Sequence, residues 1–349
     1  MSAVVVPPAT LPFDHLGRLT DARGVFEHAD HDVPRREHGY CLDDVARALL
    51  VLVREPEPSS LVANLTETSL RFVEAAIDPL GRAHNRMDVS GEWTDDATTD
   101  DWWGRAVGAL GIAATAAPLP LTRARAMRAF LRAAPQHSVD VRAMAFALPG
   151  AAAVLRARPG SEAARRLVTV GLAVIPQGTA DWGWLEPRLR YGNASLVDAL
   201  LAAGHALADD ELVDRALRRL DALLAIESRD GHLSVTGPGG RAATDTAPQF
   251  DQQPIEIAAI ADAAARAFEL TGDARWSRVV GQARDWFLGD NDSGAMMVDL
   301  AAGAGFDGLE RHGRNENRGA ESTLAALSTF QHARAVGLPS RVLASAGRR

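Results

Sequence analysis

Apolar residues recur every three to four positions along most of the chain, and segments rich in Gly, Pro and Asp interrupt this pattern. A period of 3.6 residues is typical of helices, whereas strands alternate with a period of two. A last helix over 318–335 would be completed by residues 339–349 or by residues before 24. The other predicted helices fall into pairs, at about 41–53 and 60–77, 101–116 and 121–133, 139–155 and 161–174, 193–207 and 210–226, and 253–270 and 274–288.

The two members of each predicted pair differ in composition. The first members, such as SLVDALLAAGHAL at 195–207, are rich in small residues and nearly apolar all round. The second members, such as ELVDRALRRLDALLAI at 211–226, carry a charged face. A helix that is apolar all round is buried, whereas one with a charged face lies outside. Six such hairpins predict an all-α fold, an (α/α)6 toroid, with one domain over 1–349 and its core at about 35–335.

Long loops lead from each predicted outer helix to the next inner one, whereas short turns lead from inner to outer helices. In a ring of antiparallel hairpins, the long loops therefore share the face that holds the N-termini of the inner helices. An irregular helical solenoid is the alternative, but it would not need loops this long and this aromatic. The long loops span 78–100, 175–192, 227–252 and 289–317.

The composition excludes several functions. All 37 basic residues are Arg, so a P-loop and a pyridoxal phosphate site, which both need a Lys side chain, are ruled out. A net charge of -8 with scattered Arg argues against nucleic acid as a partner, and no apolar run is long enough to suggest a membrane partner. The lone Cys41 leaves no internal disulfide, and the N-terminal stretch broken by Pro7 and Pro8 does not resemble a signal peptide. We expect a cytoplasmic protein without a cofactor, and its oligomeric state is left open.

Carboxylates stand at or near the start of each predicted inner helix. Acidic residues in a first turn complement the helix dipole and Asp is a good N-cap, so capping alone explains any single one of them. These acidic residues are Asp43, Asp44, Asp100, Asp101, Asp140, Glu186, Asp251, Glu256, Glu316 and Glu321.

Aromatic residues occur in the same segments, and capping does not require them. Aromatic rings flanked by carboxylates, amides and Arg are typical of a carbohydrate cleft, because sugar rings stack on them while sugar hydroxyls need polar partners. Two carboxylates on opposite sides of a glycosidic bond supply the acid and the base of hydrolysis. The aromatic residues are Tyr40, Trp93, Trp102, Trp103, Trp182, Trp184 and Tyr191.

Five blocks of sequence carry a family resemblance. They resemble a bacterial (α/α)6 glycosidase-like family whose members often occur beside, or fused to, glycosyltransferases. More narrowly, they resemble the mycobacterial hydrolases of methylmannose polysaccharides. The resemblance implies an endo-acting α-1,4-mannosidase that cleaves a partly methylated intracellular oligosaccharide. The blocks are REHGYCLDDVARAL (36–49), DDWWGRAVGAL (100–110), WLEPRLRYGNASLVDALLAAG (184–204), FDQQPIEIAAIADA (250–263) and NRGAESTLAALS (317–328).

The chain departs from the family pattern at three positions. Val45 replaces an amide residue beside the paired aspartates of the first block. Gly192 replaces an acid and Ser195 an Arg at the fourth inner helix. We therefore do not expect catalysis at the fourth helix.

The resemblance carries over Asp43 and Asp44 from its paired aspartates, and Glu256 from its QQPIE block. We predict Glu256 as general acid and Asp44 as the general base that activates a water, an inverting arrangement. Exchanged roles and a retaining mechanism stay open. Pro254 suits a first helical turn and would place Glu256 near the cleft. Asp43 would then cap the helix or pair with Arg47.

Other residues are predicted to bind the sugar. Because adjacent helical positions point about 100° apart, one of Trp102 and Trp103 is expected in the core. The amides and arginines could equally form structural hydrogen bonds at helix starts. The predicted substrate-binding residues are Tyr40, Asp43, Arg47, Asp101, Trp102, Trp103, Arg105, Trp182, Trp184, Tyr191, Asp251, Gln252, Gln253, Asn317 and Glu321.

Two other classes of function fit the same pattern. A carbohydrate-binding module, or a partner of a glycosyltransferase, would bind sugar without turnover. A sugar epimerase or isomerase of the same architecture would need a His pair in the cleft, whereas the inner-helix starts carry carboxylates. His28, His31, Asp32 and His38 lie close together, but they are typical polar loop residues, and no metal site is predicted.

Overall fold

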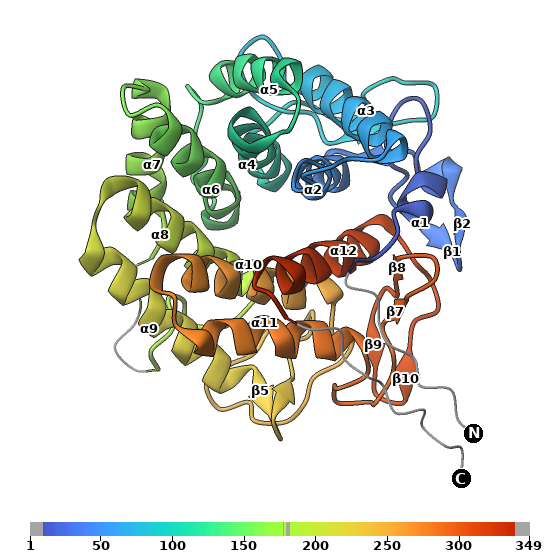
Figure 1. Ribbon diagram of the computed structural model, residues 1–349, viewed down its shortest axis with the longest axis vertical. Coiled ribbons are helices and arrows are strands. Elements are labelled where there is room, and N and C mark those ends of the chain that lie inside the picture. The colour runs from blue at the N-terminus through green and yellow to red at the C-terminus, as the bar shows by residue number, and fades with distance from the viewer. Residues whose placement is uncertain (1–9, 177, 179–181, 339–349) are drawn as a thin grey trace.

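The computed structural model describes residues 10–176, 178 and 182–338, which are mainly helical (Figure 1). Every long helix predicted from the apolar pattern forms, and each end lies within two residues of the prediction. The helices are α1 (Asp14–Arg18), α2 (Leu42–Val53), α3 (Ser60–Ala76), α4 (Asp101–Ala116), α5 (Pro120–Ala133), α6 (Val141–Ala157), α7 (Glu162–Val174), α8 (Asn193–Leu207), α9 (Asp210–Ile226), α10 (Pro254–Thr271), α11 (Ala274–Phe287) and α12 (Ala320–Ala335).

Six helices close an inner ring. Helix α2 contacts α4, and contacts continue through α6, α8, α10 and α12 back to α2. Helices α3, α5, α7, α9 and α11 each pack against the inner helix that precedes them and lie outside it (Figure 1). The predicted (α/α)6 toroid is therefore confirmed.

Burial separates inner from outer helices as their composition predicts. Most of α8 is buried, including small and apolar residues on all of its sides. In α9 the buried residues form one stripe, Leu212, Ala216, Leu220 and Leu223, whose spacing follows one face of a helix. The charged face of α9 remains in contact with solvent.

Glycines bring α4 and α6 unusually close. A Cβ atom added at Gly111 would lie 2.4 Å from the backbone of Gly150, and one added at Gly150 would lie 2.3 Å from the carbonyl oxygen of Gly108. No side chain fits between these backbones, so larger residues would force the two helices apart.

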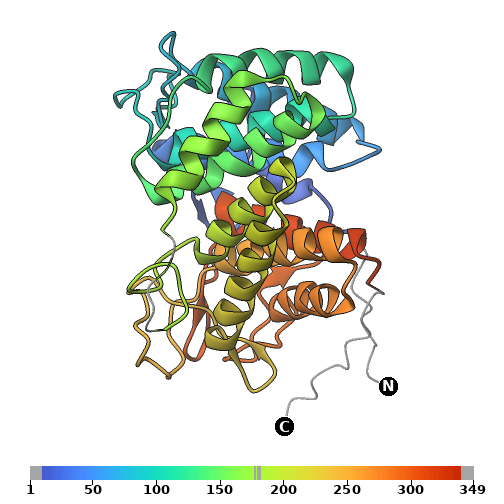
Figure 2. The same ribbon diagram turned by 90° about the vertical axis from the view of Figure 1, so that its left-hand side faces the viewer.

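The long loops share one face of the ring, and the short turns share the other (Figure 2). The loops carry five antiparallel two-stranded ribbons, which the sequence pattern did not predict because each strand has only two residues. Helix η1 (Arg36–His38) precedes the third strand. The strands are β1 (Ala29–Asp30), β2 (Val33–Pro34), β3 (Tyr40–Cys41), β4 (Arg86–Met87), β5 (Ser228–Arg229), β6 (His232–Leu233), β7 (Val298–Asp299), β8 (Ala304–Gly305), β9 (Leu309–Glu310) and β10 (Gly313–Arg314).

The sixth inner helix, α12, has a short neighbour in place of a long outer partner within the described residues. Helix α1 contacts it, and Nε2 of His15 lies 2.8 Å from the carbonyl oxygen of Arg318, just before α12. Residues before 24 thus cover part of α12, which was one of the two alternatives expected from the sequence. The other alternative, residues 339–349, lies outside the described residues. None of the described helices is long and apolar enough to span a membrane.

Candidate active site

A cavity of about 700 Å³ lies inside the ring and extends along the inner helices. Asp43, Arg47 and Leu50 of helix α2 line it together with Arg54, which directly follows the helix. These residues are spaced three or four positions apart and so share one face. At 1.5 Å per residue this stripe spans about 16 Å. The volume is in the range of small-molecule sites, which cover roughly 300–1,000 Å³.

The cavity lining has three layers. We call the polar groups near the N-termini of the inner helices the near layer. The middle layer is apolar and includes Leu50, Ala109, Ile112, Ala258 and Ala325. Polar groups near the C-termini of the inner helices form the far layer. The near layer consists of Asp43, Arg47, Asp101, Arg105, Tyr191, Gln253, Glu256 and Glu321, all of them predicted site residues.

Glu256 is a buried carboxyl group in the cavity wall. It lies in the first turn of α10, two residues after Pro254, and is 4% exposed. Its Oε1 accepts a hydrogen bond from the backbone N–H of Gly192 at 2.6 Å, and its Oε2 accepts one from Asn193 at 3.4 Å. Burial, followed by the nearby charge of Glu227, raises the pKa of Glu256 to about 8. The group is therefore protonated at neutral pH and able to donate a proton.

The adjacent aspartates of α2 point in different directions. Asp43 lines the cavity, and its Oδ1 lies 3.1 Å from Nε of Arg105. Asp44 is 2% exposed, is absent from the cavity lining, and pairs with Nη1 of Arg47 at 2.6 Å. Burial raises the pKa of Asp44 to about 7 although Arg47 opposes the shift. The sequence-based choice of Asp44 as the aspartate that faces the cleft is corrected, because the helix turns Asp43 toward it.

The remaining near-layer groups are tied to one another. Nη2 of Arg47 pairs with Oε2 of Glu321 at 2.8 Å. The hydroxyl of Tyr191 donates to Oδ2 of Asp101 at 2.7 Å, and burial raises the pKa of Asp101. These contacts hold both carboxylates in fixed positions at the cavity wall.

The predicted tryptophan platforms do not line the cavity. Trp103 and Trp184 are fully buried, so the expectation that one of Trp102 and Trp103 belongs to the core is met by Trp103. Trp102 and Trp182 donate their indole N–H groups to loop carbonyl oxygens. Tyr40 is buried and stacks on a core phenylalanine. These rings pack in the core or hold the loops in place, because burial of a large aromatic side chain contributes strongly to stability.

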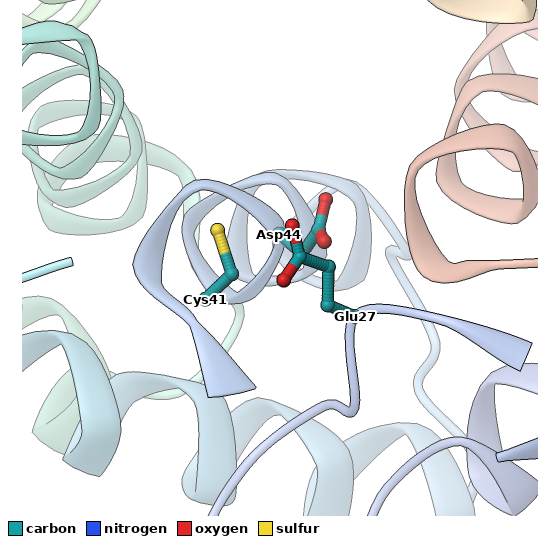
Figure 3. A group of neighbouring side chains, drawn as sticks. All are labelled: Glu27, Cys41 and Asp44. Carbon is teal, nitrogen blue, oxygen red and sulfur yellow. The ribbon is translucent and has the colours of Figure 1, made fainter. Parts of the chain in front are cut away.

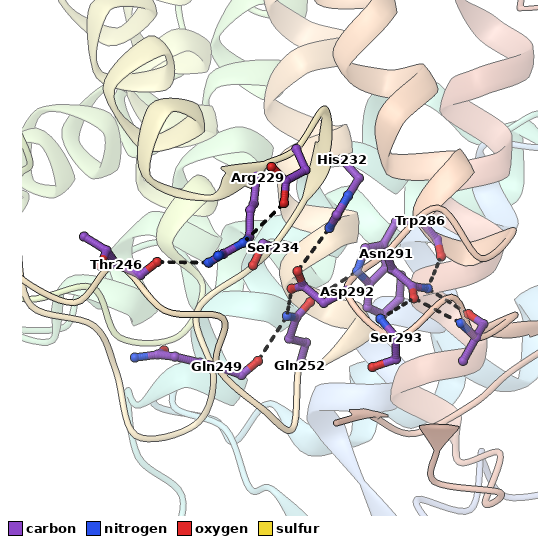
Figure 4. A network of polar contacts seen from close by, with 12 residues as sticks. Arg229, His232, Ser234, Thr246, Gln249, Gln252, Trp286, Asn291, Asp292 and Ser293 are labelled. Carbon is purple, nitrogen blue, oxygen red and sulfur yellow. Dashed lines mark hydrogen bonds and ion pairs between the residues drawn. The ribbon is translucent and has the colours of Figure 1, made fainter. Parts of the chain in front are cut away.

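Gln252, predicted to bind substrate, is instead fully buried in a polar network (Figure 4). Its Nε2 donates to Oδ2 of Asp292 at 2.5 Å and to the carbonyl oxygen of Gln249 at 3.0 Å. Its Oε1 accepts from Nε1 of Trp286 at 3.3 Å, and Asp292 also contacts Nε2 of His232 at 3.0 Å. Gln252 therefore fixes the segment that leads into α10.

Two further predicted sugar ligands lie away from the cavity lining. Asp251 is exposed at the start of the segment that leads into α10. Asn317 accepts the backbone N–H of His31 at 3.0 Å and thereby joins two loops. Both residues belong to the loop face, but their side chains do not reach the cavity.

The far layer was not predicted from the sequence. Asp262 accepts from Nη2 of Arg54 at 3.0 Å and contacts Nε2 of His332 at 2.5 Å, while Nη1 of Arg54 donates to Ser328 at 2.6 Å. Burial opposes ionisation of Asp262, but Arg54 and His332 outweigh it and hold its pKa well below its usual range. The far layer consists of Arg54, Asp198, Asp262, Arg266, Glu269, Ser328 and His332.

A sequence signal for the far layer does exist. Arg54 follows Asp43, and His332 follows Glu321, by eleven residues. Eleven residues are about three helical turns, so each pair shares one face of its helix. Polar residues at this spacing in otherwise apolar helices indicate a lined cavity.

Glu27, Cys41 and Asp44 form a compact group at the start of α2 (Figure 3). One possible ligand atom from each lies within 4.8 Å of the others. However, Glu27 is paired with Arg86 and Asp44 with Arg47. Burial, followed by the charge of Asp44, raises the pKa of the Cys41 thiol well above its ordinary value, which disfavours the thiolate that a metal would need. These contacts favour a structural role for the group.

The histidines between residues 28 and 38 make local contacts. Nδ1 of His28 lies 3.0 Å from Nδ1 of His38, and Nδ1 of His31 lies 3.0 Å from Oδ1 of Asp30. Asp32 pairs with an arginine of α1. None of these groups lines the cavity, which agrees with their reading as polar loop residues.

A search against protein-family models finds no match, and neither does a search of curated proteins. Solved structures match nearly the whole chain. A sugar epimerase from a ruminal bacterium has 13% identity and a TM-score of 0.72, with 93% of this chain and 95% of that one covered. A D-mannose isomerase has 12% identity and a TM-score of 0.68, with 93% and 95% covered.

An α-1,6-mannanase of Salegentibacter sp. HEL1_6, in complex with α-1,6-mannotetrose, has 10% identity and a TM-score of 0.63, with 93% and 96% covered. That structure is of an inactive variant in which two consecutive aspartates are replaced by alanine. Similarity at these identities establishes the shared (α/α)6 fold alone.

Proposed function

We propose that the protein is a glycoside hydrolase that cleaves α-mannosidic bonds, with Glu256 as general acid and Asp43 as general base. The observation that carries this proposal is a protonated, buried carboxyl group, Glu256, in the wall of a sugar-sized cavity that Asp43 also lines. Asp43 takes the part that the sequence alone gave to Asp44, because Asp43 is the one that lines the cavity.

In the proposed reaction, Glu256 gives its proton to the glycosidic oxygen as the bond to the anomeric carbon breaks. Asp43 accepts a proton from a water molecule, whose oxygen attacks the anomeric carbon from the opposite face. The carboxylate left on Glu256 is stabilised by the backbone N–H groups of Gly192 and Asn193 at the start of α8. Arg105 supplies a positive charge beside Asp43 throughout.

A sugar epimerase or isomerase is the second candidate, and four of the structural neighbours are enzymes of this kind. Such an enzyme moves a proton on carbon, for which a pair of histidines in the cleft is the expected chemistry. Among the described residues that line the cavity, the one histidine is His332, which lies in the far layer and is bonded to Asp262. The near layer therefore favours hydrolysis.

The finer substrate assignment rests on the family resemblance. It implies internal cleavage of a methylmannose polysaccharide in the cytoplasm, and the apolar middle layer supports it, because O-methyl groups gain from contact with apolar surface. The mannanase of the same fold adds support, since consecutive aspartates also stand at the starts of α2 and α4 here, at Asp43–Asp44 and Asp100–Asp101.

The test is to incubate the purified protein with α-mannan and with methylmannose oligosaccharides, and to follow the products by mass spectrometry and proton NMR. Hydrolysis predicts shorter chains, each cleavage adding one water, and an inverted anomer at first appearance. Products of unchanged mass with an altered sugar ring would support the epimerase instead. Binding without any product would support a carbohydrate-binding module.

A further inference from the structure

A second cleft, of about 370 Å³, adjoins the near layer. We call the cavity inside the ring of helices the axial cavity. The second cleft shares Tyr191, Gln253 and Glu256 with it, so a ligand at Glu256 has access to both. Its other walls are residues 188–190, before α8, and the loop 236–240, before α10. We call it the side cleft.

The two walls of the side cleft are held together by backbone contacts. Leu189 and Arg241 form an antiparallel bridge, with N–H to carbonyl distances of 2.8 and 3.0 Å. Gly240 has a φ of 72°, and a Cβ atom there would lie 2.7 Å from the carbonyl oxygen of Leu189. Glycine is therefore required at this position for the loop to approach the opposite wall.

The side cleft differs in charge from the axial cavity. Arg188 and Arg190 line it, and within the described residues neither guanidinium group has a carboxylate partner. Among the described residues, the Arg188 guanidinium donates one hydrogen bond, to the carbonyl oxygen of Gly239 at 3.4 Å. By contrast, each arginine of the axial cavity is paired with Asp or Glu, namely Arg47, Arg54, Arg105 and Arg266.

No negative charge within the side cleft balances these two arginines. Glu256 is the one carboxyl group among its described lining residues, and burial keeps that group protonated at neutral pH. The cleft is thus lined by two arginines and by the proton donor. Guanidinium groups bind carboxylates and phosphates through paired N–H donors, more strongly than they bind neutral hydroxyls.

We propose that the side cleft binds an anionic group, a carboxylate or a phosphate, that is carried by the sugar unit next to Glu256, with Arg188 and Arg190 as its ligands. The proposal rests on the proposed function for the position of that sugar. It adds that the natural substrate carries an acidic group on a sugar unit next to the bond that is cleaved.

Binding of unreactive monosaccharides tests the proposal separately from turnover. Calorimetry would compare mannose with mannuronate and with mannose 6-phosphate, which distinguish a carboxylate from a phosphate ligand. At low salt, at least one anionic sugar is expected to bind about tenfold more tightly than mannose. Because the arginines are exposed, this preference should shrink at about 0.5 M salt.

A double variant, Arg188→Gln with Arg190→Gln, should lose the preference for the anionic sugars and keep its affinity for mannose. The matched control is Arg128→Gln with Arg166→Gln, which removes two exposed arginines from the outer helices α5 and α7 and should keep the preference. Equal affinity for the three sugars, no binding of any of them, or an equal loss in the control variant would each overturn the proposal. Failure to cleave α-mannan, with the preference intact, would count against the proposed hydrolase alone.

Discussion

Replacing Glu256 with Gln should abolish turnover and, at alkaline pH, stabilise the protein. The amide has nearly the same shape as the carboxylic acid, and its oxygen can still accept the N–H of Gly192. The fold should therefore be kept. The variant has no proton to give to the leaving oxygen, and general acid catalysis is worth roughly a 10²- to 10⁴-fold factor in rate.

The stability effect follows from the difference between the folded and unfolded pKa of Glu256. The pKa is about 8 in the folded protein and 4.5 for an ordinary glutamate. A raised folded pKa contributes stability that is fully present below pH 4.5 and is lost as the pH rises through about 8. For a fully buried group, a shift of this size corresponds to a loss on the order of 4–5 kcal/mol, as an upper bound.

Urea unfolding at pH 5 and pH 9 would measure this difference. The wild-type protein should lose more stability between the two pH values than Glu256→Gln, so the variant should be the more stable protein at pH 9. Asp44, whose charge is not among the causes of the Glu256 shift, titrates in both proteins and cancels in the comparison. Glu211→Gln, at an exposed position of α9, is the control and should behave as wild type.

The pH dependence of activity checks the same group independently. If Glu256 must be protonated, kcat/KM should fall as the pH rises through about 8. The reasoning is refuted if Glu256→Gln turns over near the wild-type rate, or if its stability changes with pH as the wild type's does.

Three other substitutions test the near layer, the far layer and the helix packing. Asp43→Asn should lower kcat at least 100-fold in steady-state kinetics and cost about 1–3 kcal/mol in urea unfolding, because Arg105 loses the charge of its partner. Asp44→Asn should alter how the free energy of unfolding depends on pH and should keep more activity than Asp43→Asn. Asp262→Ala should cost about 1–3 kcal/mol in urea unfolding, because it leaves the partly buried Arg54 without its carboxylate partner. Gly111→Ala should cost about 1–3 kcal/mol by the same measurement, since its Cβ would meet α6 at 2.4 Å. The control Gly281→Ala, in the interior of α11 with ordinary contacts, should instead stabilise by up to about 1 kcal/mol.

The helices and their ring were predictable because burial imposes a period on the sequence. A helix such as α8 has apolar residues on all sides and buries them only in the interior of the fold. Helix α9 has a single apolar stripe, so it lies at the surface with that stripe facing inward. The alternation of short and long connections predicted that the long loops would share one face of the ring. The place of Glu256 in the first turn of α10 was predictable as well, because Pro254 fixes where the helix begins.

The orientation of individual side chains was less predictable. Asp43 and Asp44 both lie in the first turn of α2, and about 100° of helix rotation decides which one lines the cavity. That rotation is set by packing against the neighbouring inner helices, which the local sequence does not encode. Gln252 was misassigned for a related reason, since its partners Asp292 and Trp286 come from segments distant in the sequence.

The charges of the two cavities indicate which part of a substrate each would bind. In the near layer Arg47 is shared by Asp44 and Glu321, and Arg105 is paired with Asp43, so an ionic ligand would have to break existing pairs there. Breaking a buried pair costs several kcal/mol, which disfavours charged groups in the axial cavity and favours neutral sugar rings. Arg188 and Arg190 of the side cleft have no carboxylate partner among the described residues, so binding of an anion there imposes no such cost. Under the two proposals, the protein would therefore bind one substrate at two places. The axial cavity would bind its hydroxyl groups, and the side cleft would bind its acidic group.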